Sequence, residues 1–178
     1  EALIDLGLKE TSVSVNVAAQ QFQHSDHLRD VLNQAFEAHP KCQAELFTIE
    51  LTEGTLIEDI QATSDALETL KKLGFSISID DFGTGYSSLN YLKKLPVDQL
   101  KIDKSFIQGM LSGANDQAIV TAIIIIAQKL NMKLVAEGVE TIEQAQFLLD
   151  QDCEFAQGYY YHKPLPFDQL SQLISDLN

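Results

Sequence analysis

Short apolar runs alternate with longer amphipathic stretches from one end of this chain to the other. Six runs have the length and composition of β-strands: Ser12 to Val17, Leu46 to Leu51, Phe75 to Asp80, Asp98 to Ile102, Met132 to Glu137 and Glu154 to Tyr159. Strands that alternate with helical stretches predict repeated βα units around a parallel sheet. The runs are near-continuously apolar or alternating, as expected for a sheet that helices cover on both faces.

Four stretches between these runs have helical periodicity. They are a stripe from Leu28 to Phe36, a second from Leu56 to Leu70, a strongly apolar stretch from Asn115 to Leu130, and a shorter one from Thr141 to Leu149. Lys71, Lys72 and Gly74 suit the end of the second helix. Thr141 with Gln144 has the spacing of a capping box at the start of the fourth.

The length and charge of the chain limit its function. A chain of 178 residues with 45% hydrophobic and 21% charged residues is expected to form one globular domain over residues 1–178. The net charge of -14 would repel a nucleic-acid backbone, so no polymeric nucleic acid is expected as a partner. A small nucleotide bridged by metal ions remains compatible with that charge.

The cysteines and the apolar runs indicate the compartment. Cys42 and Cys153 have neither CxxC spacing nor a nearby histidine partner, so they favour free thiols in a reducing compartment. The longest apolar run, Ala122 to Ala127, is too short to span a membrane and predicts a buried helix. We expect a cytoplasmic location, and a membrane-tethered parent protein stays open.

Nearly every predicted strand ends on a side chain that can bind a metal ion or a phosphate. These are Asn16, Glu50, the pair Asp80 and Asp81, Lys101, Glu137 and Gln157. A parallel barrel gathers the carboxyl ends of its strands on one face, where barrel enzymes place their sites. The adjacent carboxylates of Asp80 and Asp81 need a cation or a proton near a core. The cluster is all oxygen, which suits Mg²⁺ or Mn²⁺ rather than zinc.

Other polar and aromatic residues carry weaker signals. The loop from Phe82 to Ser88 contains two glycines and several hydroxyls, a pattern that is weak alone but gains weight directly after two carboxylates. The histidines, His24, His27, His39 and His162, have no ligand spacing to the acids and are interpreted as structural or surface residues. The aromatic run from Tyr159 to Tyr161 is compatible with base stacking and with packing, and both interpretations stay open.

Several runs resemble the EAL domains that hydrolyse cyclic di-GMP. They are ELTE (Glu50 to Glu53), DDFGTGYSSL (Asp80 to Leu89), LKID (Leu100 to Asp103), AEGVE (Ala136 to Glu140) and QGYYYHKP (Gln157 to Pro164), and SVNVAAQQF (Ser14 to Phe22) resembles the family's Asn-bearing strand. The resemblance implies an α/β fold of the TIM type, a (βα) barrel with an antiparallel first strand, and hydrolysis of cyclic di-GMP to linear pGpG.

The resemblance also implies the roles of individual residues. Asn16, Glu50 and Asp80 would hold one Mg²⁺ or Mn²⁺ ion, and Asp80 would bridge to a second ion held by Asp81 and Glu137. Lys101 would hold and polarise the attacking water, so the implied catalytic set is Lys101, Glu50, Asp80 and Glu137. Gln157 would face the substrate, and Glu53 and Glu140 would brace the loop after Asp81.

One feature departs from the family pattern. The family is named after a Glu-Ala-Leu on an early strand, and this chain opens with Glu1, Ala2 and Leu3. The spacing to Asn16 is too short for the family's intervening helix, and residues 4–8 have the pattern of a helix end closed by Gly7. We therefore interpret the opening triplet as part of a helix. The chain is expected to hold six of the eight barrel strands, as an N-terminally incomplete or degenerate EAL domain.

The sequence leaves two alternatives to a cyclic di-GMP phosphodiesterase. A receptor that binds cyclic di-GMP without turnover is the alternative function, favoured by the absent motif glutamate and disfavoured by the other ligands. A glycosidase with two separated acids fits the adjacent Asp80 and Asp81 poorly. As partners the resemblance implies cyclic di-GMP, a second copy in a homodimer, and upstream sensory or diguanylate cyclase domains. We expect the chain by itself to be a dimer or larger, or poorly soluble, and to be nearly inactive.

Overall fold

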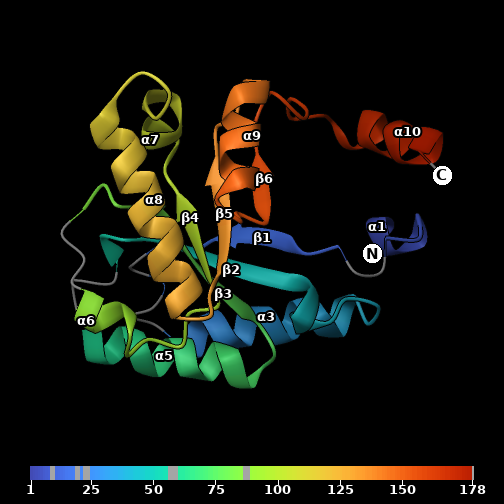
Figure 1. Ribbon diagram of the computed structural model, residues 1–178. Coiled ribbons are helices and arrows are strands. Elements are labelled where there is room, and N and C mark those ends of the chain that lie inside the picture. The colour runs from blue at the N-terminus through green and yellow to red at the C-terminus, as the bar shows by residue number, and fades with distance from the viewer. Residues whose placement is uncertain (9–10, 19–20, 22–24, 56–59, 86–88, 178) are drawn as a thin grey trace.

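The computed structural model describes residues 1–8, 11–18, 21, 25–55, 60–85 and 89–177. Within them six strands form one parallel sheet in the order β1-β2-β3-β4-β5-β6 (Figure 1). The strands are β1 Val13–Asn16, β2 Phe47–Thr52, β3 Ser76–Phe82, β4 Gln99–Ile102, β5 Lys133–Glu137 and β6 Phe155–Gln157. Every pair of neighbours is parallel, which confirms the predicted succession of βα units.

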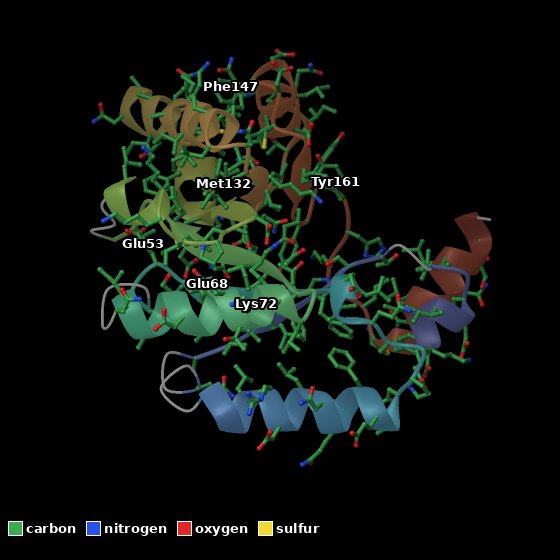
Figure 2. All side chains as sticks on the ribbon, turned by 90° about the horizontal axis from the view of Figure 1, so that it is seen from below. Glu53, Glu68, Lys72, Met132, Phe147 and Tyr161 are labelled. Carbon is green, nitrogen blue, oxygen red and sulfur yellow. The ribbon has the colours of Figure 1, made fainter. Side chains whose placement is uncertain are left out.

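Helices connect these strands. They are α1 Ala2–Asp5, α3 Ser25–Ala38, α5 Ile60–Lys72, α6 Leu89–Leu92, α7 Lys104–Gly109, α8 Ala114–Lys129, α9 Ile142–Asp150 and α10 Phe167–Leu177, with a short 3-10 turn η1 at Ala44–Leu46. Helix α5 packs on β3, and α8 packs on β4 and β5. Helices α1 and α10 lie side by side at one side of the molecule in both views (Figures 1 and 2).

The predicted helix signals have local physical causes. Thr141 and Gln144 form the capping box at the start of α9. Gly74 follows α5 with φ +104°, a left-handed conformation that glycine adopts at little cost, and so ends that helix. Leu56, predicted as the first apolar residue of the second helix, lies outside the described residues.

The core lies between the central strands and the helices that cover them. Ile49, Ile77 and Leu100 are almost fully buried on three successive strands. The run from Ala122 to Ala127 was predicted to be buried, and this is only partly right. Ile123, Ile124 and Ala127 are buried, whereas the side chain of Ile125 is 51% exposed. Helix α8 lies on the outside of the sheet, so the sheet covers only one face of it.

The sixth strand is shorter than predicted. It ends at Gln157, and the predicted last residue, Tyr159, lies in a turn. The turn forms because Tyr160 donates its amide to Val139 O at 3.0 Å and Tyr161 donates to Gly158 O at 3.1 Å. A Cβ on Gly158 would lie only 2.1 Å from Val139 O, so the chain needs glycine at this close approach.

The opening triplet belongs to a helix, as predicted. Helix α1 starts at Ala2, and Gly7 after it has φ +90°. The amide of Leu8 donates to Leu3 O at 3.0 Å, which closes the helix end. Among the helices in the described part of the chain, none combines the length and the hydropathy that a membrane span requires.

Candidate metal centre

The parallel register brings the predicted site residues to one edge of the sheet. Asn16 pairs with Glu50 across β1 and β2, and Glu137 pairs with Gln157 across β5 and β6. Asp80 pairs with Thr52 at the end of β2. All of these positions lie at the carboxyl ends of their strands, the end at which α/β proteins place ligands.

Lys101 lies at the centre of the acidic residues. Its Nζ is 2.6 Å from Glu137 Oε1, 2.9 Å from Glu50 Oε2 and 3.2 Å from Asp80 Oδ1. The side chain is buried, and burial alone would lower the pKa of Lys101. The hydrogen bonds that it donates to Glu137 and Glu50 outweigh burial and hold the pKa above its usual value. Lys101 is therefore a fixed positive charge among three carboxylates from three other strands.

Asp80, Asp81 and Glu137 form a second grouping. One carboxylate oxygen from each lies within 4.8 Å of the other two. Burial raises the pKa of Asp81, and the charge of Asp80 raises it further. Burial also raises the pKa of Glu137, although Lys101 opposes this. Removing like charges from water and holding them together is unfavourable without a cation. The oxygen donor set suits a hard divalent ion such as Mg²⁺, Mn²⁺ or Ca²⁺.

The backbone conformation at the end of β3 orients the carboxylates of Asp80 and Asp81. The register between β3 and β4 shifts between Ile79 and Phe82, and Asp81 has φ 54°. The Asp81 amide donates to Asp80 Oδ1 at 3.0 Å. A positive φ on a residue with a side chain is uncommon and clusters at functional sites. The irregularity turns two successive carboxylates toward the same region, which a regular strand would send to opposite faces.

Glu53 contacts the glycine loop after Asp81. Its Oε2 accepts the amide of Gly83 at 2.9 Å and the amide of Gly85 at 3.2 Å, and Glu53 is buried. Gly83 has φ +99°, and a Cβ on Gly85 would lie 2.8 Å from Glu53 Oε1. The rest of the predicted loop, residues 86–88, lies outside the described residues.

The remaining predicted residues lie around this centre. Gln157 donates from Nε2 to Glu137 Oε1 at 2.6 Å. The carboxylate of Glu140 accepts from Gln108 Nε2 at 3.4 Å, so its predicted contact with the Asp81 loop stays a prediction. Asn16 is exposed at the end of β1 and lines, together with Glu50, a hollow of about 420 Å³.

Two features near the centre were not predicted. Asp103 caps α7 by accepting the Ser105 amide at 2.9 Å, and its carboxylate adds to the effect of burial in raising the pKa of Asp81. The signal was available, because an aspartate followed two residues later by serine is a common helix cap. A groove of about 640 Å³ also extends from Glu137 and Gln157 past Tyr159. Lys163 Nζ lies 5.4 Å from the Tyr159 ring centroid at this groove.

The opening triplet lies away from the centre. Glu1 Oε2 is 3.4 Å from His39 Nδ1, and Glu1 Oε1 accepts the Lys41 amide at 3.4 Å. Residues 39–43 precede β2, so they lie toward the amino ends of the strands. Glu1 is the N-cap of α1, which agrees with the interpretation of the opening triplet as part of a helix and not of a strand.

Comparison with known proteins decides the family. The sequence profile described as "EAL domain" matches residues 2–164. The chain belongs to the EAL domain family. As an EAL domain it is 46% identical over 171 residues to the cyclic di-GMP phosphodiesterase NbdA of Pseudomonas aeruginosa, covering 94% of this chain and 21% of NbdA.

MucR of the same organism, a bifunctional diguanylate cyclase/cyclic di-GMP phosphodiesterase by name, is 44% identical over 167 residues, covering 94% of this chain and 24% of MucR. A solved structure of the PaMucR phosphodiesterase in complex with c-di-GMP superposes with a TM-score of 0.90 at 43% identity, over 95% of this chain and 68% of that one. This EAL domain therefore spans only about a fifth to a quarter of the two curated relatives.

A solved complex of Klebsiella pneumoniae BlrP1 with manganese and cy-diGMP superposes with a TM-score of 0.82 at 27% identity, over 91% of this chain and 41% of that one. The agreement in fold confirms the predicted TIM-type α/β class. Six strands of that architecture lie in the described part of this EAL domain.

Proposed function

We propose that this EAL domain carries the active site of a metal-dependent phosphodiesterase that hydrolyses cyclic di-GMP to linear pGpG. The observation that carries the proposal is the position of Lys101, whose Nζ lies within 3.2 Å of Glu50, Asp80 and Glu137 at the strand ends. The buried lysine is surrounded by acids and lies beside the second acidic grouping. Positive and negative charges are therefore held together at the strand ends. Support also comes from the relatives NbdA and MucR, which are named cyclic di-GMP phosphodiesterases.

The donor set supports two Mg²⁺ or Mn²⁺ ions. We assign Asn16, Glu50 and Asp80 to one ion, and Asp80, Asp81 and Glu137 to the other. The oxygens of Asp80, Asp81 and Glu137 converge within 4.8 Å, and every donor is oxygen. Bound divalent ions supply a more acidic water and neutralise charge on a phosphodiester.

The residues of the chain then have distinct tasks. Lys101, a fixed cation, holds and polarises the attacking water and stabilises negative charge that develops on the phosphate. Glu50 and Glu137 orient the Lys101 ammonium through their hydrogen bonds. Gln157 holds Glu137 and faces the groove in which the dinucleotide lies. Glu53 holds the backbone of Gly83 and Gly85. Glu140 is proposed to brace the same region, as the family resemblance implies.

The domain is proposed to act as a homodimer through the outer face of α8. Exposed residues Ala118, Ile119, Ala122 and Ile125 lie on this helix. An apolar helix face open to water favours association. Sensory or diguanylate cyclase domains are further proposed partners, because MucR combines both activities by name. A cytoplasmic site of action follows from the proposed nucleotide substrate.

The test is product formation by the purified chain with enzyme in excess over cyclic di-GMP, so that slow turnover is visible. Linear pGpG is expected with Mn²⁺ or Mg²⁺ and is expected to disappear with a chelator. Chromatography with mass detection distinguishes the linear from the cyclic dinucleotide. Metal-dependent binding of cyclic di-GMP without any pGpG would instead assign the site to a receptor.

A further inference from the structure

Gln144 is a buried polar residue in the first turn of α9 that makes more contacts than its capping role requires. Its Oε1 accepts the amide of Glu140 at 2.7 Å and the amide of Thr141 at 3.1 Å. Its Nε2 donates to Ile107 O at 3.1 Å. The residue as a whole is only 6% exposed. A capping box needs only the acceptor oxygen, which glutamate also supplies. The bond from Nε2 to Ile107 therefore has a separate consequence.

That bond joins two βα units that carry opposite charges of the candidate site. Ile107 is in α7, which begins directly after β4 and its Lys101. Glu140 and Thr141 end the loop that begins after Glu137 on β5. The contact between Lys101 Nζ and Glu137 Oε1, at 2.6 Å, is formed between these same two units. Gln144 thus connects the supports of both partners in that ion pair.

The loop after Glu137 is also in contact with the third unit of the site. Val139 donates its amide to Gln157 O at 3.1 Å, and Tyr160 donates to Val139 O at 3.0 Å. Gly138 has φ +70°, and a Cβ there would lie 2.6 Å from Lys104 Cβ at the start of α7. A displacement of this loop would therefore move Glu137 and Gln157 relative to Lys101.

We propose that Gln144 is a positioning residue, which sets the distance between Lys101 and Glu137 by joining the loop after β5 to α7. The proposal rests on the proposed function, since the reaction concerned is the metal-dependent hydrolysis stated above. Catalytic groups and metal ligands must be held to within fractions of an ångström, so loss of a supporting hydrogen bond affects metal affinity and rate. Because Glu137 is a proposed metal ligand, the measured metal affinity depends directly on the position of its carboxylate.

The decisive variant is Gln144→Glu, because glutamate keeps both acceptor contacts of the capping box and loses the donor to Ile107 O. The matched control is Thr141→Ala, which removes the other half of the same capping box and leaves the Ile107 contact in place. Mn²⁺ affinity, the single-turnover rate of cyclic di-GMP hydrolysis, cyclic di-GMP affinity and thermal stability are measured for both variants and the parent chain.

Gln144→Glu is expected to weaken Mn²⁺ binding and slow hydrolysis by about tenfold each, with cyclic di-GMP affinity nearly unchanged. Thr141→Ala is expected to lower thermal stability while Mn²⁺ affinity and rate stay at the parental values. Equal losses in both variants, or parental Mn²⁺ affinity in Gln144→Glu, would overturn the proposal. If Gln144→Glu does not fold, Gln144→Met takes its place in the same comparison with Thr141→Ala.

Failure of the proposed function would be seen separately. A parent chain that binds Mn²⁺ but forms no pGpG would remove the phosphodiesterase proposal. The Mn²⁺ affinities of the parent chain and the variants would still decide the role of Gln144. Hydrogen exchange at the Glu140 amide gives a readout independent of activity: it should accelerate in Gln144→Met, which loses the acceptor, and stay slow in Thr141→Ala.

Discussion

At the scale of single residues, Lys101 and Asp80 are the two side chains whose charges are hardest to replace. Lys101 balances three acids in a buried position, and Asp80 lies close both to Lys101 and to the Asp81–Glu137 grouping. The energy of a buried ion pair is a small difference between the cost of desolvation and the gain from attraction, so removing one partner leaves the other uncompensated. Removing the negative charge of Asp80 and removing the positive charge of Lys101 should therefore have different effects on metal affinity, rate and stability.

Asp80→Asn is expected to lower metal affinity and the rate of pGpG formation together, on the order of 100-fold or more, because a proposed bridging charge is lost. Mn²⁺ titration and product chromatography measure the two effects. Asp65→Asn, a change on α5 where Asp65 contacts Gln61, serves as the control and should be neutral. Turnover of Asp80→Asn within a few-fold of the parent would remove Asp80 from the bridging role.

Lys101→Ala should separate metal binding from rate. Without metal, the variant leaves buried acids unpaired and should unfold at a lower temperature. Its free energy of unfolding should fall by roughly 3–5 kcal/mol. Saturating Mn²⁺ should restore most of that stability, while the rate stays about 100- to 1000-fold below the parent because the water and the developing charge lose their cation. Calorimetry with and without Mn²⁺ tests this. A fall in Mn²⁺ affinity as large as the fall in rate would contradict the assignment.

At the scale of elements, the end of β3 and the loop after it form one functional unit with the end of β2. The β3 irregularity directs Asp80 and Asp81, and Glu53 from the β2 side accepts two loop amides. A carboxylate that accepts two backbone amides makes charge-assisted hydrogen bonds, which are stronger than neutral ones. If this loop moved, the carboxylate of Asp81 would be displaced from its position beside Asp80.

Glu53→Ala is expected to lower the rate of hydrolysis by about 10- to 100-fold, through loss of loop position, without unfolding the domain. Kinetics and thermal melts are measured in parallel. Glu68→Ala is the control, because Glu68 lies on α5 and its exposed carboxylate lies 3.8 Å from the Nζ of Lys72, a surface lysine (Figure 2). A large loss of thermal stability with activity retained in the folded fraction would make Glu53 a purely structural residue.

At the scale of the whole molecule, the open sheet and the outer face of α8 govern association. The strands β1 and β6 are the edges of the described sheet, and all four residues of β1 are exposed. Edge strands and exposed apolar faces both favour contact with a second copy. The face of α8 is the proposed dimer contact, and it can be tested with a single charge.

Ile125→Asp is expected to convert a dimer into a monomer, because the charge would be buried in the proposed contact between α8 helices. Light scattering coupled to gel filtration measures the mass. The control is Ile142→Asp on α9, where the side chain is 57% exposed, compared with 51% for Ile125, and where the mass should not change. A parent chain that is already monomeric, or dissociation by both variants, would contradict the proposed contact.

Local patterns in the sequence determined most of the elements and the polar side chains that stand at the strand ends. The period of the apolar residues predicted six strands and the helices α3, α5, α8 and α9, whereas α6, α7 and α10 were not predicted. The capping box at Thr141 and the stop at Gly74 followed from residue types at short spacing. Polar residues at strand ends predicted which side chains meet, because parallel strands share an orientation. These features depend on neighbours within one or two turns of chain.

Only the tertiary structure decided features that depend on distant segments. The exposure of Ile125, the turn at Tyr159 and the bond from Gln144 to Ile107 depend on which surfaces other elements cover. The contacts of Lys101 with Glu50, Asp80 and Glu137 join four strands, and no spacing in the sequence contains those distances. Burial and ion pairing are set by the sum of contacts around a side chain, and the chain acquires those contacts only when the sheet and its helices have assembled.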